Sequence, residues 1–389
     1  PPAVPPAPAT AATDGDAARF LTQATFGPTL AETTNFTGQA FAAWIDAQMA
    51  LPPTYHLPYF QFRRAELMAR DGSDGWQTPR QQAWWQHALT APDQLRQRMA
   101  WALSQIFVIS QFGALDGEHE ATTMYYDMLL EHAFGNYRDL IEDVTISPMM
   151  GTYLSMMRNR KPDPYTGHEP DENYAREIMQ LFSIGLMRTH NDGSLMLDAE
   201  GMPIATYTQD DIVALAHVFT GWGPHYDPAD PPEWGPNNVA QPDDWFLWGW
   251  DSLRPMSFCG EFHDTSNRVI AGGAVIPAGT NGPARLALAL DALFQHPNTG
   301  PFIARQLIQR FVTSNPGPGY IHRVASVFND NGQGVRGDLG ATLKAVLLDY
   351  EARSPAARNA FSYGKPVEPI IRMTRMLRGL LPAAPFATN

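Results

Sequence analysis

Cysteine, lysine and charge of either sign are scarce in this chain of 389 residues. The single cysteine, Cys259, excludes an intramolecular disulfide and a zinc site built from several thiolates. Lysine stands at only three of the 27 basic positions, Lys161, Lys344 and Lys365, and the others are arginines. This bias fits either GC-rich coding or a use for the forked hydrogen bonding of the guanidinium group. Charged residues make up 17% of the chain and hydrophobic residues 44%, which argues against a disordered or coiled-coil protein.

Long apolar runs and basic clusters are also missing. No apolar run reaches the roughly 18 residues that a membrane-spanning helix needs, so no membrane span is expected. The net charge is −13, whereas binding to nucleic acid or to anionic lipid needs a basic surface. The composition therefore predicts a protein with a sizeable core that does not bind nucleic acid.

Residues 1–16, PPAVPPAPATAATDGD, have the composition of a linker. Proline and alanine stiffen such a segment toward extended polyproline II, and its side chains offer little to pack. Segments of this kind often follow a cleaved signal peptide or lipid anchor. We therefore expect a disordered linker at 1–16 and a bacterial protein exported to the periplasm or the cell exterior. An ordinary disordered tail is the alternative.

Apolar residues recur at helical spacing through most of the remaining sequence, so residues 17–389 are expected to form a single domain of many helices. Residues 80–111 predict two helices divided near Pro92, because proline suits the first turn of a helix. Residues 171–187 have the strongest helical pattern. The other predicted helices are 16–24, 29–36, 40–50, 118–133, 136–146, 147–158, 208–219, 284–296, 300–313, 319–330, 338–350 and about 364–380.

Two segments interrupt the helical pattern. The sequence NDGSLMLDAEGMPIATY (191–207) predicts a small β-hairpin with its turn at Asp198 to Gly201. Residues from about 223 to 283 are rich in Pro, Gly, Asp, Asn and Trp and show little periodicity. A stretch of that length inside a compact domain is usually functional or disordered. The predicted fold class is all-α, with a small β-hairpin and one long irregular Trp/Pro/Gly-rich insertion.

Several long motifs make the chain resemble a known bacterial family. They are LRQRMAWALSQIFVIS (95–110), GNYRDLIEDVTISPMMGTYL (135–154), NRKPDPYTGHEPDENYAREIMQLFSIGL (159–186), YTQDDIVALAHVFTGW (207–222), HPNTGPFIARQLIQRFVTSNP (296–316) and VFNDNGQGVRGDL (327–339). From about residue 17 onward, the chain is similar to the domain-of-unknown-function family number 1800, DUF1800.

The resemblance implies an exported helical protein and an exported partner. Members of the family look exported, and they are often encoded beside a sulfatase-like exported family. The family pattern has a lysine a few residues after the position of His263, where the nearest basic residue of this chain is Arg268. An amine that can lose its proton is therefore missing at that position.

The predicted helix 171–187 has one strongly polar face. On a helical wheel with about 100° per residue, its polar side chains fall in an arc of about 140°. Helix geometry places the Cβ atoms of the two glutamates at the edges of this arc roughly 10 Å apart. The polar residues are Glu172, Asn173, Arg176, Glu177 and Gln180.

Two carboxylates at this separation suggest glycoside hydrolysis, with inversion favoured because water fits between them. Arg176 lies one turn from Glu172 and favours its charged form. Glu172 is therefore expected to act as base and Glu177 as acid, while Arg176 and Asn173 orient the substrate and His263 closes the site. The structural alternative is that first-turn acidic residues stabilise the helix dipole, by about 0.3–1 kcal/mol each, and that Glu172 and Arg176 form an ordinary i,i+4 ion pair.

The irregular insertion is rich in tryptophan. The sequence WFLWGWD places Trp245, Trp248 and Trp250 close together, with Trp222 nearby. Aromatic faces stack on sugar rings, and loops are where such platforms are found. With Gln180, these four tryptophans are the predicted substrate-binding residues for a polysaccharide or other glycan. The alternative is that the rings cover the core beneath the insertion.

Histidines also flank the insertion. His217, His225 and Asp227, with His263 and Asp264, offer imidazoles and a carboxylate of the kind that binds metals. They contain no helix-spaced pair of the type H-x-x-x-H. No metal and no other cofactor is therefore predicted, and His217, His225 and Asp227 are the candidates if one binds.

Common nucleophile and nucleotide motifs are missing: there is no G-x-S-x-G elbow, no P-loop and no G-x-G-x-x-G after a strand. The predicted function is an exported carbohydrate-active hydrolase of glycosidase type. One alternative is a non-catalytic periplasmic or surface assembly protein that works with an exported partner. The other is a metal-dependent hydrolase.

Overall fold

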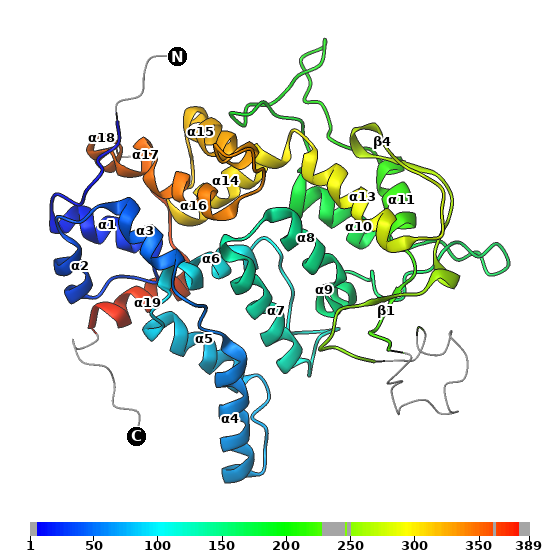
Figure 1. The fold of residues 1–389 in the computed structure, drawn as a ribbon, viewed down its shortest axis with the longest axis horizontal. Coiled ribbons are helices and arrows are strands. Elements are labelled where there is room, and N and C mark those ends of the chain that lie inside the picture. Colours follow the sequence, from blue (N-terminus) through cyan, green and yellow to red (C-terminus); the bar gives the residue numbers. More distant parts are fainter. Residues whose placement is uncertain (1–5, 228–245, 247–249, 361–362, 381–389) are drawn as a thin grey trace.

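The structure, a computed structural model, describes residues 6–227, 246, 250–360 and 363–380, and it is all-α apart from small strands (Figure 1). Within these residues no helix is long and apolar enough to cross a membrane. The helices before the insertion are α1 (Asp14–Ala24), α2 (Leu30–Phe36), α3 (Phe41–Met49), α4 (His56–Asp71), α5 (Thr78–Thr90), α6 (Gln94–Ser104), α7 (His119–Glu131), η1 (His132–Phe134), α8 (Tyr137–Ile146), α9 (Pro148–Tyr153), α10 (Asn173–Glu177), η2 (Ile178–Ser183) and α11 (Gln209–Val218).

The helices after the insertion return to the same body. They are α13 (Gly282–Gln295), α14 (Thr299–Phe311), α15 (Pro318–Asn329), α16 (Leu339–Leu348), α17 (Tyr350–Arg353), α18 (Pro355–Asn359) and α19 (Pro369–Leu380). Figure 1 shows α17–α19 lying beside α1–α3, so the first and last helices cover one end of the molecule. One continuous cluster of buried apolar residues includes Phe20 of α1, Phe182 of η2 and Leu343 of α16. Helices on both sides of the insertion thus share a core.

Part of the predicted linker 1–16 is ordered, and the prediction is wrong from about residue 9. Ala11 is fully buried, its N–H donates to the Gln39 carbonyl, and its carbonyl accepts from Gly38. Thr13 then caps α1 through a capping box with Asp16. The alanine side chains of this segment are small enough to pack against the core. The polar residues 14–16 (DGD) begin helix α1. Residues 1–5 lie outside the described residues.

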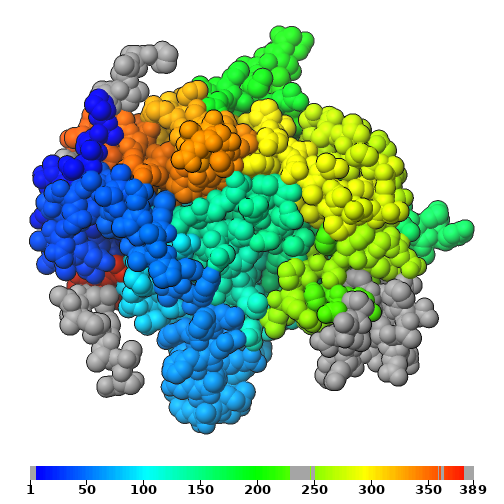
Figure 2. Space-filling model, viewed as in Figure 1, coloured from blue at the N-terminus to red at the C-terminus, as the bar shows by residue number. Residues whose placement is uncertain are grey.

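The predicted helix pair at 80–111 is confirmed in its division near Pro92, but α6 ends at Ser104. Helix α4 was not predicted. It projects from the body (Figures 1 and 2), and only His56 and Phe60 of its residues are buried. The apolar stripe that would reveal a core-facing helix is therefore short. Its first turn is instead held by Asp127 of α7, whose carboxylate accepts the N–H groups of His56 and Leu57 at 2.8 Å.

The hairpin segment has its turn where the sequence predicts it. The N–H of Asp198 donates to the carbonyl of Met202, and that of Gly201 donates to Asp198. Antiparallel bridges join 187 to 205, 189 to 195 and 197 to 203. The segment projects from the edge of the molecule, as the green protrusion of Figure 2 shows.

The insertion is less irregular than predicted. Strand β1 (Trp222–Gly223) pairs with β2 (Ser257–Phe258), and β3 (Arg268–Ile270) pairs with β4 (Ala274–Ile276), both antiparallel. The short helices η3 (Gly260–Phe262) and η4 (Ala271–Gly273) lie between them. Residues 228–245 and 247–249 lie outside the described residues.

Arginines satisfy the carbonyl groups at helix C-termini, which have no partner within their own helix. Arg96 donates to Leu130 at the end of α7, Arg98 to Arg310 at the end of α14, and Arg336 to Phe294 at the end of α13. The bias toward arginine that the composition shows thus has a structural use. The aliphatic part of the arginine side chain passes through the core, and its guanidinium group donates hydrogen bonds to backbone carbonyl oxygens.

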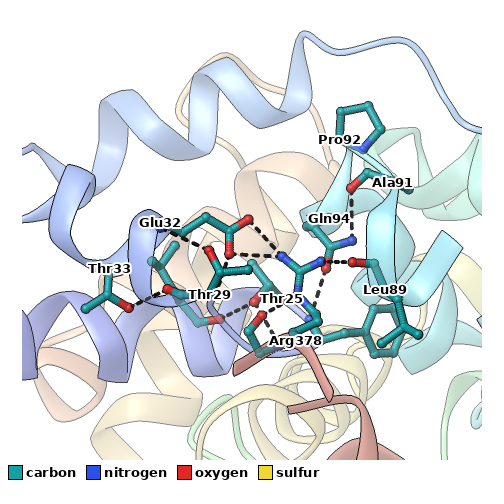
Figure 3. A network of polar contacts seen from close by, with 12 residues as sticks. Thr25, Thr29, Glu32, Thr33, Leu89, Ala91, Pro92, Gln94 and Arg378 are labelled. Atoms are coloured by element: carbon teal, nitrogen blue, oxygen red, sulfur yellow. Dashed lines mark hydrogen bonds and ion pairs between the residues drawn. The ribbon is translucent and has the colours of Figure 1, made fainter. Parts of the chain in front are cut away.

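Arg378 of α19 joins three elements in the same way (Figure 3). Its side chain is almost fully buried. It donates to the carbonyls of Gly27 and Leu89 and pairs with Glu32 at 2.8 Å. The last helix is thereby fixed to the α1–α2 connection and to the end of α5.

We predict that Arg378→Ala lowers the free energy of unfolding by about 2–4 kcal/mol, because two backbone carbonyls lose their buried donor. Urea unfolding followed by circular dichroism measures this. Arg372→Ala is the matched control, because Arg372 is an exposed arginine of the same helix, and its change should stay within about 0.5 kcal/mol. Equal effects of the two substitutions would contradict the assigned role of Arg378.

Candidate functional site

The helix predicted at 171–187 is shorter and changes type. It begins at Asn173 and is α-helical to Glu177, and Ile178–Ser183 form a π-helix. The N–H of Ile184 donates to the Met179 carbonyl, five residues back, and the Ser183 hydroxyl donates to the Ile178 carbonyl at 2.6 Å. The 100° wheel therefore holds through Glu177 but fails for Gln180. Single π-turns inside helices occur often at functional sites.

Neighbouring elements explain the π-turn and the early end of the helix. The Phe182 carbonyl accepts from the Tyr137 hydroxyl, and the Ile184 carbonyl accepts from the Asn298 amide at 2.9 Å. Gly185 then adopts a φ of +69°, with Phe302 so close that a Cβ would clash. Side chains distant in sequence thus replace the partners of a regular helix end.

Glu172 lies on the surface in a charged pair. Its carboxylate accepts from Arg176 at 2.9 Å and from the Gln209 amide of α11 at 2.7 Å. Asn173 is exposed. The predicted i,i+4 ion pair is present, and Gln209 adds a partner from a second helix.

Glu177, on the other edge of the face, has a different environment. Its side chain is half-buried, and within the described part of the chain its Oε2 atom is enclosed without a hydrogen-bond partner. Burial raises the pKa of Glu177, and the charge of Arg176 opposes this only in part. Tyr207 lies near enough for the Glu177 charge to contribute to its raised pKa, and its hydroxyl is 3.5 Å from Gln180. The two glutamates at the edges of the polar face thus have different environments: Glu172 is ion-paired with Arg176, and Glu177 is enclosed.

Asn159 joins the start of this helix to the base of the insertion. Its side chain exchanges two hydrogen bonds with the backbone of Asp171, at 2.8 and 2.9 Å. Its carbonyl accepts from Gly221, whose own carbonyl accepts from Cys259. The structure therefore brings the segment preceding Glu172 close to Gly221, which lies just before the predicted insertion, and to Cys259 within it.

His217, His263 and Asp264 meet in a buried polar network. The Asp264 carboxylate accepts from His217 and Arg268 and, at 2.5 Å, from the Ser266 hydroxyl. Burial alone would raise the pKa of Asp264, but the hydrogen bonds from Ser266, Arg268 and His217 outweigh it and hold this pKa well below its usual range. Burial also lowers the pKa of His217, which favours its neutral form.

His263 is sealed inside the same network. It is 1% exposed, its Nδ1 lies 2.8 Å from the Thr220 carbonyl, and its Nε2 accepts from Arg285 at 2.9 Å. Both ring nitrogens are engaged with protein groups. The structure thus places His263 in the anchoring of the insertion to α11 and α13, not on an open surface.

The predicted tryptophan platform is divided. Trp222 is buried and packs on Phe258, which agrees with the alternative that it covers the core. Trp250 is exposed, with the Arg158 guanidinium 5.7 Å from its ring centre. Trp245 and Trp248 lie outside the described residues.

The metal candidates do not converge. Across residues 6–227, 246, 250–360 and 363–380, no group of three or more His, Cys, Asp or Glu side chains is arranged to hold a metal ion. His217 is bound to Asp264, and the His225 Nδ1 atom lies 3.3 Å from the Pro255 carbonyl. Asp227 also interacts with another group of the protein.

Sequence reasoning missed four residues that shape this region: Asn159, Tyr207, Gln209 and Arg285. Asn159 lies in the long motif 159–186. The polar residues around it in that motif were the sequence feature that could have indicated its role. The other three contact the site from elements distant in sequence, which no local pattern reveals.

Asp264→Asn tests the buried network. A carboxylate whose folded pKa is depressed stabilises the protein above its unfolded pKa, here about 3.8, and that contribution is lost as pH falls toward the folded pKa. We therefore expect the variant to lose about 3–5 kcal/mol at pH 7, with the gap to wild type closing below pH 3.8. Melting curves over this range measure it. A gap that does not change with pH would contradict the ionic role.

Glu177→Gln tests the enclosed carboxylate. A folded pKa raised above the usual 4.5 means that ionised Glu177 destabilises the protein at pH 7, and that this penalty fades as pH falls through the folded pKa. The variant should melt at or above the wild-type temperature at pH 7, and the difference should vanish near pH 4.5. A melting temperature several degrees lower at pH 7 would instead make Glu177 part of a structural network.

Comparison with known proteins places the chain in a family. The sequence profile described as "Protein of unknown function (DUF1800)" matches residues 19–388. Searches of curated proteins and of solved structures find no match. Because the profile covers nearly the whole chain, the motifs around Asn159 and the central helix are parts of one family pattern, and this protein belongs to the DUF1800 family.

Proposed function

We propose that this protein is an exported carbohydrate-active hydrolase that cleaves glycosidic bonds, with Glu177 as acid and Glu172 as base. The observation that carries the proposal is the contrast between the two carboxyl groups. Glu172 is ion-paired with Arg176, whereas Glu177 has an enclosed oxygen without a hydrogen-bond partner among the described residues, and burial raises its pKa. A carboxyl group whose pKa is raised by burial is suited to act as the acid, beside a carboxylate held in a polar, hydrogen-bonded environment.

The proposed reaction assigns one proton transfer to each carboxyl group. Glu177 donates its proton to the glycosidic oxygen as the bond from that oxygen to the anomeric carbon breaks. Glu172 accepts a proton from the water whose oxygen forms the new bond to that carbon, so the products are two sugars, one of which has an inverted configuration at the attacked anomeric carbon. Five residues of helix place the two Cβ atoms roughly 10 Å apart, and side chains of this length leave room for a water molecule.

Neighbouring polar groups have positioning roles in this proposal. Arg176 and Gln209 hold the Glu172 carboxylate, and Asn173 stands exposed beside it. Gln180 lies within the π-helical segment, near Tyr207. Trp250 is the exposed aromatic face available to a sugar ring among the described insertion residues.

The proposal is tested by incubating wild type and variants with a panel of polysaccharides and peptidoglycan and measuring released reducing sugar. Glu177→Gln and Glu172→Gln should each lower the rate at least about 100-fold, because each removes a proton-transfer group. Glu142→Gln is the matched control: Glu142 forms a comparable i,i+4 pair with Arg138, and the variant should keep full activity. Wild-type protein that releases no product from any substrate would refute the hydrolase proposal.

A non-catalytic assembly role is the second candidate, favoured by exposed apolar side chains on the hairpin. Leu186, Leu195, Leu197 and Met202 are all exposed on this projecting segment. Exposed apolar patches mark sites of protein interaction. Leu197→Glu should then weaken binding to the purified sulfatase-like exported protein that the family resemblance suggests, measured by calorimetry, while hydrolysis stays absent.

A further inference from the structure

A cavity of about 430 Å³ lies where α4 begins, between α5, the end of α6 and α7. None of the residues considered above as catalytic or sugar-binding lines it. Its walls are aromatic and include Trp84 and Trp85 of α5, Trp101 of α6 and Tyr126 of α7. The ring centres of Trp84 and Trp101 are 5.0 Å apart. Cavities of this size that combine aromatic walls with a few polar groups are typical small-molecule sites.

His56 brings an oriented polar group to this cavity. It is 3% exposed, and it lines the cavity as the first residue of α4. Its Nδ1 lies 3.2 Å from the Asp127 carboxylate, which also accepts the backbone N–H of His56 and so fixes the ring. The proton of a neutral ring is thereby held on Nδ1. Its Nε2 is left as an acceptor, and it has no hydrogen-bond partner among the residues that the structure describes.

Two donors line the same cavity. The indole N–H of Trp101 is enclosed without a partner in the described part of the chain, and so is the Nε–H of Arg80. The side-chain bond of Arg80 is to the neutral Gln111 amide, and no described carboxylate lies within ion-pair distance of its guanidinium. Its half-buried charge therefore lacks the counter-ion that a buried cation normally requires.

We propose that this cavity binds a small carboxylate carried on a ring. The carboxylate would accept from Arg80 and Trp101, since charge-assisted hydrogen bonds of this kind are the strong ones. The ring would pack against the tryptophan-lined wall of the cavity, and a ring hydroxyl would donate to His56 Nε2. Aromatic hydroxy acids and sugar acids share this chemistry. The inference is independent of the proposed hydrolase function, because it uses none of the residues around Glu177.

The experiment titrates the intact protein with 4-hydroxybenzoate and, separately, with D-glucuronate, following tryptophan fluorescence and heat. Three tryptophans line the cavity, so occupancy should change the emission. The uncharged matches are 4-hydroxybenzamide and D-glucose. We expect saturation by at least one acid, and at least tenfold weaker binding of its uncharged match. Saturation by the first acid alone identifies an aromatic acid as the ligand class, and saturation by the second alone identifies a sugar acid.

Variants locate the binding site. Arg80→Gln keeps a polar group beside Gln111 and should weaken binding about tenfold to a hundredfold. Trp101→Phe keeps the ring and loses the N–H, and should weaken binding severalfold. Arg64→Gln is the matched control, because Arg64 is an arginine of α4 outside the cavity, and its variant should bind as wild type does.

Three outcomes would overturn the inference. They are no saturation by either acid up to roughly 10 mM, equal binding of acid and uncharged match, or unchanged binding in both Arg80→Gln and Trp101→Phe. Melting curves show whether each variant is folded. If Arg80→Gln does not fold, Trp101→Phe decides the result.

Discussion

Buried guanidinium groups that bond to carbonyl oxygens at the ends of helices are the interaction on which this structure depends. Every helix leaves carbonyls without partners at its C-terminus, and a domain of many short helices has many such ends inside. Arg96, Arg98, Arg336 and Arg378 each reach such an end from another element. A lysine presents a compact, strongly hydrated charge that loses more solvation on burial, which explains why arginine is used almost alone.

Hydrogen bonds from an arginine to backbone carbonyls also hold the insertion in place. Arg285 of α13 donates to the carbonyls of Asp264 and Ser266 and to the His263 ring. Asn159 ties the other side of this base to the start of α10. The base of the insertion is therefore bonded to the segment that precedes Glu172. An irregular segment with a fixed base is a common way to place binding groups next to a helix.

Local patterns predicted most of the helices and the hairpin turn, because apolar periodicity and turn chemistry act over a few residues. They did not predict α4, whose first turn is held by Asp127 of α7, or the π-turn, whose carbonyls are satisfied by Tyr137 and Asn298. Both depend on side chains distant in sequence. For the same reason the opposite edges of the polar face were predicted correctly in position, while the enclosure of Glu177 became visible only in the fold.

So many buried carbonyls in this fold have a hydrogen-bond donor that buried polar atoms without a partner become informative. Several unpartnered atoms are the Nε of arginines such as Arg96 and Arg285, whose other nitrogens bond to backbone carbonyls, and these differ from Arg80, whose bond is to the Gln111 side chain. Atoms of other side chains are also enclosed without a partner in the part of the chain that the structure describes, and among them are Glu177 Oε2, His56 Nε2 and Trp101 Nε1. Each such atom costs about 1–3 kcal/mol, an expense that natural proteins retain mainly where a ligand or a reaction uses the group. Phe107, which lines the cavity, packs on Phe182 of the π-turn, so an aromatic contact joins the cavity wall to the helical segment that follows Glu177.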